Sequence, residues 1–323
     1  MGKQRLERRK RLKTKKKNAL DEPEKPGRQN SCLKYLEKNY KMLMIFPLLL
    51  LVLALIQIGY QDFTTGDFIN KGVSLKGGLT VTIPVDDNSD LLALEKQIEE
   101  EYPELDFNFR ALTSGIGATT AAIIQADLTE EDEREQFIEH LVHITGTTRE
   151  DMNVDIMGPT LGDSFFRETI IAVIIAFFLM GGVVFLYFRT AISSLTIILK
   201  SFSNIAITIA IINLLGINVS TAGVAAFLMI IGYSIDTDVL LATRVFKEKK
   251  GDVFSRIITA AKTGLTMTTS TLVALIAALF ISQSPVLNQI MTILLIGLLI
   301  DIINTWILNA GLLRYYIERK GLA

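Results

Sequence analysis

The sequence is poor in the residues that build disulfides and metal centres. It has one cysteine, Cys32, so the chain cannot form an internal disulfide, and its folded parts have to be stable without one. Its two histidines, His140 and His143, lie far from that cysteine, which excludes the Cys/His spacing of a zinc site. A glycine-rich phosphate loop of the Walker type is also missing. We therefore expect no metal, no cofactor and no ATP hydrolysis within this chain.

Charged residues are scarce in two long stretches. Half of the 323 residues are hydrophobic and 21% are charged. Only four charged side chains occur between residues 169 and 243, and only one between residues 263 and 313. This segregation excludes a soluble protein and predicts six helices that can cross a hydrocarbon core of about 30 Å. We place them at residues 42–58, 169–188, 193–215, 219–241, 263–282 and 286–312.

The basic residues predict the orientation of these spans. They gather in the tail 1–41, at Arg189, in the loop 244–262 and after residue 313, whereas the turns 216–218 and 282–285 contain none. Because basic loops stay inside, we expect both termini in the cytoplasm and a multi-pass protein of the plasma membrane. We interpret residues 1–41 as a largely disordered tail that binds anionic lipid beside an uncleaved signal anchor, and not as a nucleic-acid site.

Residues 60–163, with 22 acids against six bases, lie outside the membrane in this scheme and form a domain of their own. Alternating or short apolar runs predict strands at residues 79–85, 107–112, 119–126 and 152–157. Helical spacing with N-terminal caps predicts helices at 89–102 and 129–145. The order β-α-β-β-α-β is typical of a ferredoxin-like fold, an antiparallel sheet with both helices on one face. The last five spans then occupy residues 167–316.

Four ionisable residues fall within the predicted spans and are candidates for ion relay. A carboxylate in the centre of a lipid-facing helix costs roughly 2.5–3.5 kcal/mol, so such a residue usually faces a polar interior. Asp236 is either a relay residue or a structural partner of Lys200, and the sequence leaves both possibilities open. Asp238 lies about 200° further round the helix, and we expect it near the interface, paired with Arg244. Asp301 lies near the middle of the last span.

Polar side chains on the last four spans predict a polar interior. The fifth span opens with hydroxyl residues from Thr263 to Thr271, which either pack helices closely or solvate a neighbouring acid. An intramembrane aspartyl protease built on Asp236 and Asp301 is an alternative function. The sequence before Asp301, Gly297 to Ile300, lacks the Gly-x-Gly of those proteases, so we do not expect an enzyme.

Three short motifs resemble the SecF branch of the SecD/SecF protein-export family. They are the glycine pair after the first span, the motif that precedes the second span, and the middle of the fourth span, and their residues are Gly77, Gly78, Gly158, Pro159, Gly232, Tyr233 and Ser234. The resemblance extends over about residues 42–316. Asp236 stands where bacterial SecF has asparagine, and the environment of Asp301 looks more like the archaeal branch.

The resemblance implies an accessory subunit of the Sec protein translocase. Its partners would be SecD, the SecY channel, the translocating preprotein and the lipid membrane, with no nucleic acid. It also implies an ion gradient as the energy source. A half-transporter of the resistance-nodulation-division type that exports lipid or drug is the alternative within the same superfamily.

Overall fold

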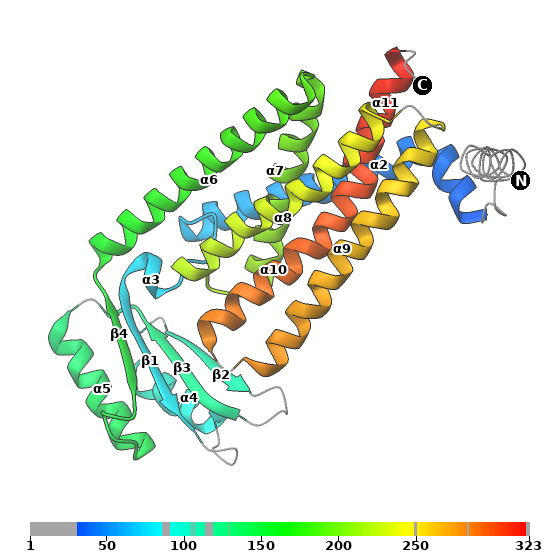
Figure 1. Ribbon diagram of the computed structural model, residues 1–323. Helices are drawn as coiled ribbons and strands as arrows, with labels where there is room; N and C mark the ends of the chain where they lie inside the picture. The colour runs from blue at the N-terminus through cyan, green and yellow to red at the C-terminus, as the bar shows by residue number, and fades with distance from the viewer. Residues whose placement is uncertain are drawn as a thin grey trace, which may run out of the picture. The chain divides into compact units, whose positions relative to one another are not determined.

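The computed structural model describes residues 31–85, 91–103, 105, 107–113, 119–128, 130–248, 251–282 and 284–320 (Figure 1). The chain divides into two compact units, residues 1–40 and 41–323. Helix α2 (Ser31–Thr65) departs from helical dihedral angles at Asn39, next to this boundary. The other helices and all the strands that the structure describes belong to residues 41–323.

Six helices within the described residues are long and apolar enough to cross a membrane, which confirms a multi-pass membrane protein. The first is the part of α2 from Lys38 to Thr65. The others are α6 (Pro159–Phe188), α7 (Ala191–Leu214), α8 (Thr221–Phe246), α9 (Val253–Ile281) and a last, composite helix. That composite helix consists of α10 (Pro285–Ile303), the π-helical segment η1 (Asn304–Asn309) and α11 (Ala310–Lys320).

The connection between α8 and α9 is shorter than predicted. We expected a loop over residues 244–262, but α8 continues to Phe246 and α9 begins at Val253. The Arg256 guanidinium donates hydrogen bonds to the carbonyls of Val245 (2.9 Å) and Glu248 (2.6 Å). Carbonyls at a helix end need such partners, so this arginine supports the extended end of α8.

Helices α7 and α8 form the centre of the bundle. The most apolar window of α7 is 61% buried and that of α8 is 50% buried, against 17% for α2, 17% for α6 and 11% for α9. The composite helix packs against α7, α8 and α9, and α6 packs against α7 and α8. Polar groups that face inward from α7, α8 and α10 are therefore removed from lipid.

The segment between α2 and α6 folds as an antiparallel sheet of four strands with two long helices (Figure 1). The elements are β1 (Gly78–Pro84), α4 (Leu91–Glu101), β2 (Phe107–Thr113), β3 (Thr119–Ala126), α5 (Glu131–Thr145) and β4 (Asn153–Met157). The strand order is β2-β3-β1-β4, and Val81 of β1 pairs with Ile124 of β3 and with Val154 of β4. The predicted β-α-β-β-α-β order is confirmed. The caps predicted at Ser89 and Thr129 lie outside the described residues.

One apolar core holds the sheet and its helices together. Leu79, Val81 and Ile83 alternate along β1 and are fully buried, as the period of a strand requires. Ile98 of α4 and Phe137 of α5 belong to the same buried cluster. Both helices therefore cover one face of the sheet. Burial of one such side chain contributes roughly 1.5–3 kcal/mol.

A polar junction joins this sheet to the end of the bundle where α7 and α8 meet. The amide of Val219 donates to the carbonyl of Asn70 (2.7 Å), and the amide of Gly72 donates to the carbonyl of Val219 (2.8 Å). The Asn213 side chain of α7 donates to the Phe68 carbonyl (3.0 Å). The short helix α3 (Val73–Lys76) follows this junction and leads directly into β1. The start of α8 is thus tied to the root of the sheet.

Candidate functional site

Lys200 is the centre of a buried cluster of charges inside the bundle. It lies near the middle of α7, and its side chain has no solvent exposure. Its ammonium group lies 2.5 Å from Asp301 Oδ1 and 3.1 Å from Asp238 Oδ2, and it donates a further hydrogen bond to the Ser234 hydroxyl. Three helices, α7, α8 and α10, thus meet at one ammonium group.

Asp238 reaches the cluster from α8 together with Ser234. The two residues are four positions apart, so they lie one turn apart on the same face of the helix. Asp238 is fully buried, and its second oxygen accepts a hydrogen bond from the Asn309 amide (2.8 Å). Every carboxylate oxygen of Asp238 therefore has a partner.

Asp301 accepts hydrogen bonds from three helices besides its contact with Lys200. The Ser234 hydroxyl donates to its Oδ1 (2.6 Å), and the Asn204 amide of α7 donates to the same atom (3.2 Å). The Thr305 hydroxyl donates to Oδ2 (3.3 Å). Hydrogen bonds as well as the ion pair with Lys200 thus hold this carboxylate in position.

The π-helical segment η1 begins three residues after Asp301 and lets the composite helix present several groups to the cluster. An α-helical turn holds 3.6 residues, so a residue four positions after Asp301 would be rotated away from it around the helix axis, and a residue eight positions after it would be rotated further. A π-helix has wider turns with i→i+5 hydrogen bonds, which keeps Thr305 and Asn309 on the side of Asp301. Both residues are buried, and both donate hydrogen bonds to the cluster acids. Segments of this kind are common at functional sites.

The cluster holds one basic side chain and two acidic ones. When all three are ionised, it has a formal charge of −1 within the bundle, where an uncompensated charge is expensive. One added proton or one monovalent cation would neutralise it. The amide oxygens of Asn204 and Asn309, both buried, have no hydrogen-bond partner in the described structure. Two amide oxygens without partners therefore lie on the asparagines that contact the acids of a cluster with one more acid than base.

Asp236 does not belong to this cluster, which contradicts a pairing with Lys200, one of the two roles that the sequence left open. Its side chain is exposed on the outer surface of α8, and among the described residues it makes no ion pair and no side-chain hydrogen bond. The reason is the helical phase, since Ser234 and Asp238 fix the inward face of α8 and Asp236 points away from it. The protease alternative, which needs Asp236 beside Asp301, is contradicted by the same geometry.

The predicted position of Asp238 was wrong as well. We expected it near the interface and paired with Arg244, but it is buried beside Lys200. Arg244 instead pairs with Glu248, four residues further along the chain. The prediction failed because it treated Asp236 as the inward-facing acid. A residue two positions further along an α-helix points to the opposite side, so that choice placed Asp238 on the outer face.

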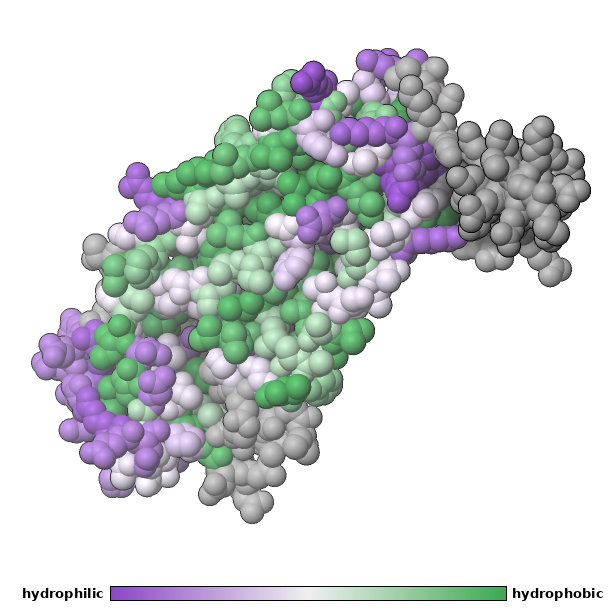
Figure 2. All heavy atoms as spheres, in the orientation of Figure 1, coloured by the Kyte–Doolittle hydropathy of each residue, from purple (hydrophilic) through white to green (hydrophobic). Residues whose placement is uncertain are grey.

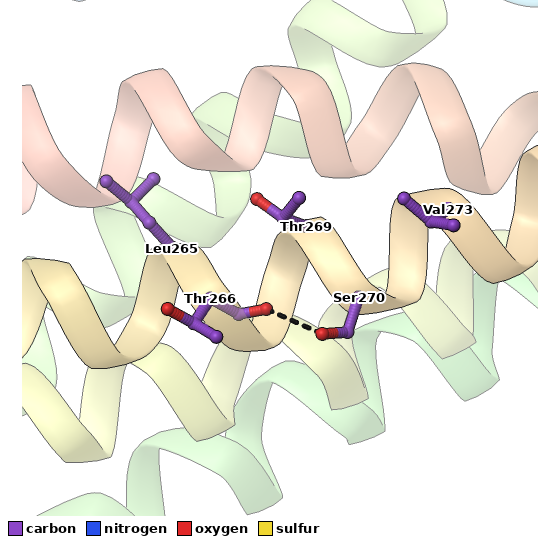
Figure 3. Close-up of a pocket in the computed structure, with 5 residues that line it drawn as sticks. All are labelled: Leu265, Thr266, Thr269, Ser270 and Val273. Carbon is purple, nitrogen blue, oxygen red and sulfur yellow. Dashed lines mark hydrogen bonds between the residues drawn. The ribbon is translucent and has the colours of Figure 1, made fainter.

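The hydroxyl residues of α9 mostly face outward and do not reach the cluster acids. Thr268 is buried, but Thr263, Thr266, Thr269 and Ser270 are exposed. The Ser270 hydroxyl donates to the Thr266 carbonyl (2.9 Å) on the outer surface of the helix (Figure 3). Solvation of an acid by these side chains is therefore excluded in this chain.

The residues of the three motifs lie in different elements. Gly232 and Tyr233 are exposed on α8 beside the inward-facing Ser234. The glycine pair shapes the backbone where β1 begins, and Gly77 and Gly78 have φ of +95° and +118°.

The third motif begins α6. Gly158 is the residue before the first helical turn, and Pro159 occupies that turn. No group of three or more His, Cys, Asp or Glu side chains that could hold a metal occurs among the described residues.

The sequence identified the acids and Lys200 as candidate site residues but did not predict which of them contact one another. The π-helical segment was not predicted, although Asp301, Thr305 and Asn309 recur at intervals of four residues. That spacing is the one signal in the sequence that indicated a shared polar face. The polar interior predicted for the last four spans had no assigned contacts, and the structure places the Asn204 amide on Asp301.

Comparisons with known proteins agree on one family. Residues 137–319, more than half of the chain, match the family model described as protein export membrane protein SecD/SecF, C-terminal. The chain is 36% identical over 285 residues to the protein-export membrane protein SecF of Methanocaldococcus jannaschii, with 87% of this chain and 96% of that protein covered. It is 35% identical over 289 residues to the SecF protein of Pyrococcus furiosus, with 88% and 93% covered.

The fold also resembles solved structures of SecDF. The crystal structure of SecDF from Thermus thermophilus gives a TM-score of 0.69 at 19% sequence identity and covers 86% of this chain. A second SecDF crystal structure, in a super-membrane-facing form, gives a TM-score of 0.58 at 21% identity and covers 88% of this chain. The match extends over 38% and 39% of those solved chains, so this chain spans less than half of their length. By its sequence matches, the chain belongs to the SecD/SecF family of protein-export membrane proteins.

Proposed function

We propose that this protein works with SecD as an accessory subunit of the Sec translocase and uses an ion gradient to promote protein export. Its place in protein export follows from the SecF relatives, which align over most of their length. The partnership with SecD is supported by the SecDF chains, of which this fold accounts for about two fifths. The SecY channel and the translocating preprotein are the further partners of such a subunit.

We infer that the four-stranded sheet and its helices, within residues 60–163, form a ferredoxin-like domain outside the membrane. The strand order β2-β3-β1-β4 with antiparallel neighbours and both helices on one face supports this assignment. The basic tail 1–41, the first span and the helices of residues 167–316 complete the domain plan. A domain in this position can contact a polypeptide as it leaves the channel.

The orientation is testable by thiol labelling. If both termini are cytoplasmic, a membrane-impermeant maleimide applied to intact cells should leave Cys32 unlabelled. In a Cys32→Ser background, a cysteine introduced at the exposed Glu139 of α5 should be labelled under the same conditions. Broken cells provide the control, because both thiols should react there. Labelling of Cys32 in intact cells would reverse the proposed orientation.

The buried cluster is the observation that supports ion coupling. Lys200 balances only one of its two acids, so the protonation of Asp238 or Asp301 alters the net charge that α7, α8 and α10 share. Moving one elementary charge through 100 mV supplies about 2.3 kcal/mol. A change of this size can shift the packing of three helices that meet at one ammonium group. We place the relay on Asp238 and Asp301, with Lys200 as their fixed counter-charge.

The relay is tested by neutral variants of the two acids. Asp238→Asn and Asp301→Asn each remove a titratable group and keep the side-chain size, and each leaves Lys200 with one carboxylate. We expect both variants to insert and to retain SecD but to lose the gradient-dependent part of export. Export would be measured with and without a collapsed membrane potential and pH gradient. Asp155→Asn, on the exposed surface of β4, is the matched control. Unchanged gradient dependence in both cluster variants would contradict the relay.

A further inference from the structure

The turn between α6 and α7 lies at the end of the bundle away from the sheet. Only Arg189 and Thr190 separate the two helices. The span of α6 ends at Phe188 and that of α7 begins at Ala191, so two membrane spans end at this turn. In Figure 2 the green surface of α6 ends in purple side chains where Figure 1 shows the turn into α7. This turn therefore lies at the level of the lipid headgroups.

Helix α7 begins without a side-chain cap. Thr190 is the N-cap residue and has an extended backbone, but its side chain accepts no hydrogen bond from the helix. Its hydroxyl lies 2.9 Å from the Ser193 hydroxyl instead. The first N–H groups of an α-helix have no partner within the helix, and the helix dipole adds a partial positive charge there. Such a helix end attracts anions, and phosphate groups in particular.

Ser194 adds a buried hydroxyl to the same end of α7. The residue is only 8% exposed, and its Oγ has no hydrogen-bond partner among the described residues. Side chains of an α-helix are inclined toward its N-terminus, so this hydroxyl is directed toward the free N–H groups. A buried polar atom without a partner is rare in a folded protein. An anion at the start of α7 would supply the acceptor that Ser194 lacks.

Arg189 places a cation at this helix end. It is exposed, and it makes no ion pair and no side-chain hydrogen bond with another described residue. Its backbone has φ of +54° and ψ of +28°, a left-handed conformation that glycine adopts more easily. A glycine would end α6 as well or better, so the turn by itself does not require an arginine. The guanidinium therefore has a role that the backbone does not explain.

Lys247 places a second cation at the same corner. It directly follows α8, and its ammonium lies 3.5 Å from the ring centroid of Tyr187 and 5.5 Å from that of Phe188. These are the two residues that precede the turn. The adjacent Glu248 is paired with Arg244, and Lys247 has no acidic partner among the described residues. Two uncompensated cations thus lie beside the uncapped start of α7.

We propose that the start of α7, together with Arg189, Ser194 and Lys247, binds the phosphate of an anionic membrane lipid. The free N–H groups and the Ser194 hydroxyl donate to the phosphate oxygens. The guanidinium and the ammonium supply charge-assisted contacts. In the orientation proposed above, this lipid belongs to the cytoplasmic leaflet.

The position of the site favours a lipid over a soluble phosphate. The spans of α6 and α8 end at this level and that of α7 begins there. The last turns of α6 expose Val183, Leu186 and Tyr187 directly beside the turn. Acyl chains can cover this apolar surface while the headgroup reaches the start of α7. A soluble anion would gain nothing from it.

Lipid titration of the purified full-length protein in mild detergent tests the site. Dioleoyl phosphatidylglycerol, which is anionic, should raise the melting temperature and form a bound adduct in native mass spectrometry. Dioleoyl phosphatidylcholine, which has no net charge, should do neither at the same concentration. Inorganic phosphate is the soluble arm, and equal stabilisation by it would overturn the assignment to a lipid. The absence of a phosphatidylglycerol adduct would overturn the site itself.

Variants of the two cations test which residues hold the lipid. Arg189→Gly and Lys247→Gln should each weaken phosphatidylglycerol binding about fivefold, since a basic residue near a membrane surface contributes about 1 kcal/mol. Arg319→Gln removes the same charge from the exposed end of α11 and should keep wild-type affinity. An equal loss in this control would mean unspecific attraction to basic residues and would overturn the site.

Stability without lipid separates binding from a role in the fold. Arg189→Gly should not lower the melting temperature of lipid-free protein, because glycine suits a positive φ. Ser194→Ala should also leave it unchanged and should weaken lipid binding about threefold, the usual effect of one lost hydrogen bond. The proposal is wrong if Arg189→Gly melts at a lower temperature yet binds lipid as the wild type does. Wild-type lipid binding by both variants would likewise contradict it.

Discussion

Replacing Lys200 with methionine should destabilise the bundle by about 3–5 kcal/mol, the usual cost of removing one partner from a buried ion pair. Asp238 and Asp301 would then face each other without a counter-charge, and Ser234 would lose its bond to the ammonium. The expected results are a lower abundance in membranes and a lower melting temperature of the purified protein in detergent. Lys96→Met, at an exposed position of α4, is the control and should leave both unchanged.

A triple variant separates the structural role of the cluster from its proposed relay. Lys200→Met combined with Asp238→Asn and Asp301→Asn removes all three charges and keeps the side-chain sizes similar. Because neutral groups of similar volume can replace a buried ion network with little loss of stability, the triple variant should recover most of the lost abundance. Export should nevertheless lose its dependence on the ion gradient. A triple variant with normal abundance and normal gradient dependence would contradict the relay.

Gly78→Ala should unfold the root of the sheet, with an expected loss of about 2–6 kcal/mol from backbone strain and overpacking together. Gly78 has φ of +118°, a region that L side chains rarely adopt, and a methyl group there would lie 2.6 Å from the carbonyl oxygen of Ala126. Neither backbone can move away easily, because Leu79 pairs with Ala126 in the sheet. The result should be faster proteolysis of residues 60–163 in membranes.

Gly158→Ala is the matched control for this variant. Gly158 belongs to the same set of motif residues, but its φ is −71° and a side-chain carbon built on it would meet no atom within 4 Å. It should therefore leave protease resistance and abundance unchanged. Equal resistance of the Gly78→Ala and wild-type proteins would show that the backbone at this position is not strained by a side chain.

The membrane helices and the sheet elements were predictable because both depend on local patterns. Long apolar windows located every span, although not its ends, since the helices continue past those windows wherever their terminal carbonyls find partners, as those of α8 do at Arg256. Strand alternation located β1, with Leu79, Val81 and Ile83 on one face. The strand order required long-range pairing, which no local pattern specifies.

The candidate site was predictable in its residues but not in its connections. The rarity of charge within apolar spans identified Lys200, Asp236, Asp238 and Asp301. The assignment of partners failed, because a sequence gives the angle between two residues on a helix and not the direction in which either one points. The π-helical segment was missed for a related reason, since its wider turn leaves no distinctive composition.

The sequence by itself determined six apolar windows long enough to cross a membrane, one segment of βαββαβ order and the ionisable side chains within those windows, because hydropathy and periodicity are local properties. The tertiary structure decided the rotation of each helix about its axis. Packing of α7, α8 and α10 brought Asp238 and Asp301 onto Lys200 and left Asp236 on the outer face of α8. Two acids that are neighbours in the sequence thereby acquired opposite surroundings, because two residues along an α-helix turn the side chain through about 200°.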